Sequence, residues 1–81
     1  QHPARLAKRL LSLCELHGED ASGGRAVKIS QEELANFLGV TRQAVNEQLQ
    51  AWKARGWVAR GRGTVILHDA AALKRQVNAA R

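Results

Sequence analysis

The chain has 81 residues, with 13 Lys and Arg against 7 Asp and Glu and a net charge of +6, which is the size of one small domain. Its single cysteine excludes an intramolecular disulfide scaffold, and no apolar stretch approaches the roughly 20 residues that cross a bilayer. The composition indicates a cytoplasmic globular domain with little room for a catalytic pocket, and the positive charge favours a polyanionic partner, most often nucleic acid.

The N-terminal part of the chain has the pattern of a helix, a loop and a short strand. Apolar residues recur at helical spacing behind Pro3, which predicts a helix over residues 3–17. Residues 18–25 are rich in glycine and polar residues, which predicts a loop, and the alternation at residues 27–29 predicts a strand. The expected buried stripe of the helix includes Leu6, Leu10, Leu13 and His17.

Two capped helices with a very short connection follow. Ser30 and Glu33 have the spacing of a capping box, which predicts that a helix begins at residue 31. Gly39 ends this helix, and Thr41 is the expected N-cap of a third helix over residues 42–55. The apolar residues expected to be buried in these two helices are Leu34, Phe37, Leu38, Val45, Leu49 and Trp52.

The C-terminal part has the pattern of a hairpin and a last helix. Residues 57–60 and 64–68 are expected strands, residues 61–63 are the tight turn between them, and Asp69 caps the helix that follows. The element order predicts an α+β, mainly α fold over residues 1–81: a winged helix-turn-helix domain with a three-helix core, a β-hairpin wing and a C-terminal helix.

The connection between the second and third helices meets the steric demands of a helix-turn-helix. This motif needs a small residue where the helices meet, a glycine with left-handed backbone in the turn, and an apolar residue that locks the pair. Ala35, Gly39 and Val45 meet these demands in that order. Because capping, turn and core residues agree, the motif is fairly specific.

The exposed face of the helix at 42–55 carries side chains that match base edges. At about 100° per residue, Gln43, Glu47 and Gln50 lie roughly opposite Val45. Arginine pairs with guanine, Gln or Asn pairs with adenine, and Glu accepts from the cytosine amino group. The predicted base contacts are Arg42, Gln43, Asn46 and Glu47. The predicted backbone contacts are Ser30, Thr41, Gln50, Lys53, Arg60 and Arg62.

The predicted contacts of Glu47 and of the wing have further support from the sequence. Glu47 has no cation three or four residues away on its helix, so it either reads a base or selects against wrong sequences. The wing at residues 60–63 concentrates arginine beside glycine, which suits the sugar–phosphate backbone or the minor groove. The alternative for all of these positions is an ordinary solvated helix face or turn.

Residues 29–68 resemble the C-terminal DNA-binding domain of Crp/Fnr-type bacterial transcription regulators. The resemblance rests on Ile-Ser-Gln-Glu-Glu-Leu-Ala, Gly-Val-Thr-Arg-Gln-Ala-Val-Asn and Gly-Arg-Gly-Thr-Val-Ile-Leu-His, and the first helix is also similar. Arg42 matches the family's arginine at the start of the recognition helix. Gln43 stands where many members have Glu, and Glu47 stands where the best-known members have a base-reading Arg, so the operator should differ from the familiar one.

The resemblance implies partners outside the chain itself. It implies that residues 1–81 are a fragment of a homodimeric regulator, that an N-terminal effector-sensing domain is absent, and that the isolated domain is monomeric. A cyclic nucleotide or another effector would bind that absent domain, and RNA polymerase is a candidate partner of the full-length protein. Double-stranded DNA is the expected partner of the domain itself.

Other classes of protein are less consistent with the sequence. Winged helices also serve as protein-interaction modules, which is the main alternative to sequence-specific DNA binding. An RNA or single-strand binder would expose stacking aromatics, but the chain has one Phe, no Tyr and two Trp with core spacing. No catalytic, cofactor-binding or metal-binding residues are predicted, since Cys14 and His17 supply only two candidate ligands where structural zinc needs four.

Overall fold

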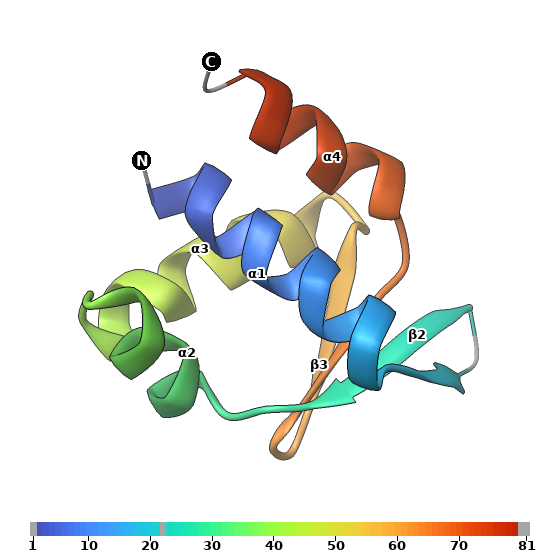
Figure 1. Ribbon diagram of the computed structural model, residues 1–81, viewed down its shortest axis with the longest axis horizontal. Helices are drawn as coiled ribbons and strands as arrows, with labels where there is room; N and C mark the ends of the chain where they lie inside the picture. Colours follow the sequence, from blue (N-terminus) through green and yellow to red (C-terminus); the bar gives the residue numbers. More distant parts are fainter. Residues whose placement is uncertain (1, 22, 80–81) are drawn as a thin grey trace.

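Four helices and four short strands make up the described part of the chain, residues 2–21 and 23–79, in this computed structural model (Figure 1). Helix α1 packs against α4, α2 and β2, and α3 packs against α2 and β3. The mainly helical α+β fold predicted from the sequence is confirmed. The elements are α1 (His2–His17), β1 (Glu19–Ala21), β2 (Gly24–Lys28), α2 (Gln31–Leu38), α3 (Arg42–Ala54), β3 (Val58–Gly61), β4 (Thr64–Leu67) and α4 (Ala70–Ala79).

The strands form one antiparallel sheet in the order β1-β2-β4-β3. Strands β3 and β4 are the predicted hairpin, with Gly61 paired with Thr64 beside the turn. On its other edge β4 pairs with β2, where Val27 lies opposite Val65. The wing is therefore the outer hairpin of a four-stranded sheet, and β2 pairs with β4 along the whole length of β4, as far as Thr64 beside the turn.

The prediction of a loop over residues 18–25 is wrong, because β1 and the start of β2 occupy much of this range. Gly23 has a φ of 79°, which gives the left-handed backbone that this turn requires. A Cβ on Gly24 would lie 2.1 Å from the carbonyl oxygen of Leu67, so only glycine fits against β4 there. Pairing with the existing sheet edge outweighs the low strand propensity of this segment.

The core consists of apolar side chains from all four helices and from strands β2, β3 and β4. The predicted stripes of α1 and α3 are buried, except at His17, the last residue of α1, which is exposed because the last turn packs through Cys14 instead. The largest nearly inaccessible side chains are Trp52, Leu6, Leu10, Leu34, Leu49, Leu73, Val45 and Val58.

Phe37 is not a core residue, contrary to the prediction from helical spacing. Its side chain is 59% exposed, and the Arg9 guanidinium lies 3.7 Å from the centroid of its ring. Helix α2 is only eight residues long, and Leu34, Ala35 and Leu38 already supply its buried face. Phe37 therefore stays outside the core, and the cation–π contact with Arg9 covers one face of its ring.

The N-termini of both helices in the helix-turn-helix are held by the hydrogen bonds predicted for them. The backbone N–H of Glu33 donates to Ser30 Oγ at 3.0 Å, and Glu33 Oε1 accepts from the Ser30 N–H at 3.0 Å, so the capping box is present. The N–H of Ala44 donates to Thr41 Oγ1 at 3.0 Å. Gly39 has a φ of 73°, and Ala35 and Val45 are both buried.

Gly39→Ala is expected to lower the free energy of unfolding by about 1–2 kcal/mol, the cost of a left-handed backbone for an L-residue. No atom lies within 4 Å of the added Cβ, so the loss comes from the backbone alone. Gly61→Ala is the matched control, because its Cβ would make only an ordinary 3.7 Å contact with Thr64 and its φ is not positive. Urea unfolding followed by circular dichroism measures both, and equal losses would contradict the strain at Gly39.

Candidate DNA-binding interface

Helix α3 carries the four residues predicted to contact bases, and its opposite side is fixed in the core. Val45, Leu49 and Trp52 are buried. Arg42, Gln43 and Glu47 are exposed, and Asn46 is half-buried beside them. The helix ends at Ala54, one residue earlier than predicted, because Arg55 is its C-cap. The first two turns of α3 therefore present a polar face whose direction is set by the buried side.

Glu47 has a neighbour on its own helix, although the neighbour is not a cation. The amide nitrogen Nε2 of Gln43 donates a hydrogen bond to Glu47 Oε2 at 3.2 Å. The two residues are four positions apart, so they lie on the same face one turn from each other. Two residues predicted to act separately on bases thus form one hydrogen-bonded pair in the free domain.

Arg60 lies in β3 and is separated from the exposed turn of the wing only by Gly61. Its Nη1 donates to Asn46 Oδ1 at 2.8 Å. On its other side stands Gln31, whose amide oxygen, in the orientation that satisfies both groups, accepts from Nε of Arg60 at 3.2 Å and also from Nη2. Arg60 therefore joins the wing to the recognition helix and to the start of α2.

Gln31 belongs to this interface but is not predicted from the sequence. It is the first residue of α2, where the pattern indicates only a helix start. No short-range spacing relates Gln31 to Arg60, because they belong to separate elements, α2 and β3, and meet only in the folded chain. We call Gln31, Arg42, Gln43, Asn46, Glu47 and Arg60 together the recognition surface.

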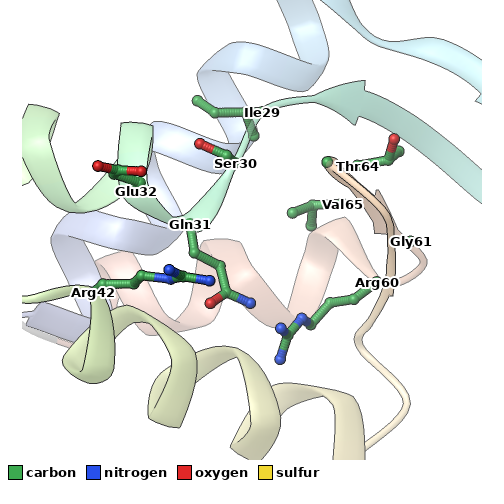
Figure 2. A pocket seen from close by; sticks show the side chains of 10 residues that line it. Ile29, Ser30, Gln31, Glu32, Arg42, Arg60, Gly61, Thr64 and Val65 are labelled. Carbon is green, nitrogen blue, oxygen red and sulfur yellow. The ribbon is translucent and has the colours of Figure 1, made fainter.

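Two adjoining hollows lie along the recognition surface. One, of about 270 Å³, is bounded by the start of α2, the start of α3 and the wing, and includes Ser30, Arg42 and Arg60. Figure 2 shows Gln31 between Arg42 and Arg60, each coming from a different element. The other, of about 430 Å³, is lined by Gln31, Arg42, Gln43, Asn46 and Arg60. Two arginines at a shallow, open polar surface suit an extended anion better than an enclosed small molecule.

The remaining predicted backbone contacts surround this surface. Arg62 is exposed in the wing turn beside Gly63, whose φ is 63°. Thr41 is exposed at the start of α3, and Ser30 is half-buried at the start of α2. Gln50 and Lys53 are both exposed farther along α3. The structure brings Ser30 and Arg60 to one hollow, whereas Gln50 lies about 12 Å beyond Arg42 along the helix axis.

Among residues 2–21 and 23–79, no group of three or more His, Cys, Asp or Glu is placed to hold a metal ion. Burial raises the pKa of the Cys14 thiol above its ordinary value, although the nearby Arg25 guanidinium partly opposes this shift. The thiol is therefore a protonated core group at neutral pH. In the same described ranges, no helix has the length and apolar character that crossing a membrane requires.

The fold and this surface define a winged helix-turn-helix domain with a polar recognition helix. The chain belongs to the Crp-like helix-turn-helix domain family, whose sequence profile matches residues 4–76. It is therefore a DNA-binding helix-turn-helix domain of the CRP/FNR class of transcription regulators, and this family is not an enzymatic one. The resemblance inferred from the sequence is confirmed.

Relatives and solved structures agree with this assignment. The chain is 34% identical over 76 residues to the CRP-like cAMP-activated global transcriptional regulator of Mycobacterium tuberculosis, covering 91% of the chain and 34% of that protein. It is 30% identical to the CO-dependent transcription factor CooA from Carboxydothermus hydrogenoformans, with a TM-score of 0.88 over 95% of this chain and 37% of CooA. The CRP/FNR-family regulator TTHA1359 from Thermus thermophilus is 26% identical, with a TM-score of 0.89 over 96% of this chain and 41% of that one. The chain thus spans about a third of the length of the curated relatives it matches.

Proposed function

We propose that this domain binds a specific sequence of double-stranded DNA, with α3 in the major groove and the wing on the sugar–phosphate backbone. The observation that carries the proposal is the recognition surface, where amide, carboxylate and guanidinium groups from α3, the start of α2 and β3 gather beside the exposed side of α3. These are the groups that pair with base edges in the major groove. The buried opposite side of α3 holds this surface in one orientation.

We also propose the setting in which the domain acts. By analogy with the relatives, an N-terminal effector-sensing domain precedes it, a cyclic nucleotide is a candidate effector of that domain, and the full-length regulator works in the cytoplasm as a homodimer with RNA polymerase as a partner. A dimer would read two half-sites about 34 Å apart, one turn of the duplex. The domain alone is expected to sediment as a monomer, and a tight dimer in sedimentation velocity would contradict this part of the proposal.

Fluorescence anisotropy with labelled mixed-sequence duplexes at several salt concentrations tests DNA binding. We expect binding at low salt and a steep loss of affinity as salt rises, because counterions released from the phosphates drive association. Selection from random duplexes should then enrich a particular sequence. Absence of binding at low salt, or affinity without salt dependence, would contradict DNA recognition and favour a protein-interaction role for the domain.

Arg62→Ala is expected to weaken binding to all duplexes about equally and to reduce the slope of log affinity against log salt by about 1. Arg62 is exposed in the wing turn, where it can contact phosphate but has no fixed orientation toward a base. Lys74→Ala removes the same charge from the exposed side of α4 and should leave the slope nearly unchanged. Equal effects of the two substitutions would show that only net charge matters and that the wing makes no phosphate contact.

A further inference from the structure

We propose that hydrogen bonds within the recognition surface assign donors and acceptors to its two halves before DNA arrives. Asn46 with Arg60 forms a donor half, and Gln43 with Glu47 forms an acceptor half. The donor half selects a base whose major-groove edge carries only acceptors, and the acceptor half selects cytosine. This inference rests on the proposed function, since it names the bases that the same surface reads.

The orientation of Asn46 follows from the chemistry of its partner. A guanidinium has five N–H donors and no acceptor, so the group 2.8 Å from Arg60 Nη1 must be the amide oxygen of Asn46. The NH₂ group of Asn46 is then turned away from Arg60. Arg60 is itself held from the other side by the amide oxygen of Gln31, which keeps the guanidinium in place.

This orientation disfavours adenine as the base that Asn46 reads. An asparagine that recognises adenine accepts from N6 through its oxygen while donating to N7 through its nitrogen. At Asn46 the oxygen is engaged by a charged donor, and other N–H groups of Arg60 stand beside it, so an adenine amino group there would meet donors. Guanine, with its O6 and N7 acceptors, and thymine, with O4, can instead accept from the Asn46 NH₂.

The same reasoning determines which amide atom of Gln43 faces Glu47. An ionised carboxylate only accepts, so the group 3.2 Å from Glu47 Oε2 must be the amide nitrogen of Gln43. The Gln43 oxygen is turned away from Glu47, so this oxygen and the free Glu47 Oε1 are acceptors that the pair offers outward, beside the second N–H of the Gln43 amide. Adenine would bring its N7 acceptor toward the carboxylate, whereas cytosine presents its N4 amino group without a neighbouring acceptor of its own. Cytosine is therefore the base that the acceptor half is expected to select.

The two halves are close enough to read neighbouring base pairs. Residues 43 and 47 lie one turn apart with residue 46 between them, so the face spans about 5–6 Å along the helix axis. Successive base pairs are about 3.4 Å apart. The expected half-site thus contains a cytosine within one or two steps of a guanine or thymine, and adenine is disfavoured as the contacted base at both positions.

Selection of bound sequences from random duplexes, with the 81-residue chain and three variants, tests the inference. Arg60→Leu frees the Asn46 oxygen and is expected to admit adenine at the donor position. Glu47→Gln lets the Gln43 amide turn over and is expected to admit adenine at the acceptor position. Arg60→Leu should raise the ratio of adenine to guanine or thymine at the donor position about tenfold, and Glu47→Gln should raise the ratio of adenine to cytosine at the acceptor position by the same factor. A tenfold change lies within the discrimination that one good base contact provides. Arg75→Leu, on the exposed side of α4, removes a charge as a control and should leave both preferences unchanged.

The outcomes separate this inference from the proposed function. Absence of binding, or binding with no enriched sequence, would overturn sequence-specific recognition itself. An enriched wild-type site with adenine at either contacted position, or Arg60→Leu lowering affinity for every sequence without changing preference, would overturn the donor and acceptor assignment alone. The sequence selected by the unchanged chain tests the assignment even if a variant fails to fold. Circular dichroism of each variant detects such a failure.

Discussion

Trp52→Ala is expected to lower the free energy of unfolding by about 3–5 kcal/mol, as removal of a buried aromatic side chain does in other cores. The side chain of Trp52 is 2% exposed, and it is the largest among the nearly inaccessible residues. A chain of this size has a total stability of about 4–12 kcal/mol. The substitution therefore threatens the folded state itself, and the transition should move to much lower urea concentration.

Trp57→Ala is the matched control for this prediction. Trp57 undergoes the same chemical change but is only half-buried, with the Arg55 guanidinium 5.2 Å from its ring centroid. Its replacement should cost clearly less than that of Trp52, because less apolar surface returns to water. Urea unfolding followed by far-ultraviolet circular dichroism avoids dependence on tryptophan fluorescence. A loss at Trp52 no greater than that at Trp57 would contradict the central role of Trp52 in the core.

The position of Trp52 links stability to recognition. Val45, Leu49 and Trp52 form one buried side of α3, and the residues predicted to read bases occupy the side left exposed. A cavity at Trp52 removes packing from the C-terminal half of the helix, while the N-terminal half remains fixed by the Thr41 cap and Val45. The direction in which the exposed side of α3 faces thus depends on the buried packing of its opposite side.

Most of the fold was predictable because its signals are local. Helix caps, the left-handed glycine and apolar residues at helical spacing each act over a few residues, and they correctly predict α2, α3 and their turn. The β1–β2 hairpin depends instead on an edge of β4, which comes much later in the chain and which no local pattern reveals. Phe37 has the right spacing to be buried, but spacing does not tell how much core a short helix can fill.

The candidate site also has features that follow from local sequence and features that depend on the tertiary fold. The positions of Arg42, Gln43, Asn46 and Glu47 on one face of α3 follow from helical geometry. The pair between Gln43 and Glu47 is also local, and a search for amide as well as charged neighbours four residues away would find it. The contacts of Arg60 with Asn46 and Gln31 could not be predicted, because they require the relative placement of three separate elements.

Arg42→Ala is expected to weaken binding to the selected sequence by about 5–150-fold, the equivalent of the 1–3 kcal/mol that a bidentate base contact contributes. Arg42 is the first residue of α3 and is exposed beside the larger hollow of the recognition surface, so its side chain can reach forward into a groove. Affinity for unrelated duplexes should fall much less, because only one positive charge is lost there. Fluorescence anisotropy with selected and scrambled duplexes measures both effects.

Arg42→Lys separates the two contributions that Arg42 makes to this result. Lysine keeps the positive charge but lacks the planar fork of N–H donors, so affinity for scrambled DNA should be preserved while affinity for the selected sequence still falls. If Arg42→Lys restored both affinities, Arg42 would act through charge alone, as predicted for Arg62 in the wing. Base discrimination would then depend on the two hydrogen-bonded pairs, Gln43 with Glu47 and Asn46 with Arg60, because the Glu47 carboxylate repels phosphate and gains nothing from charge attraction alone.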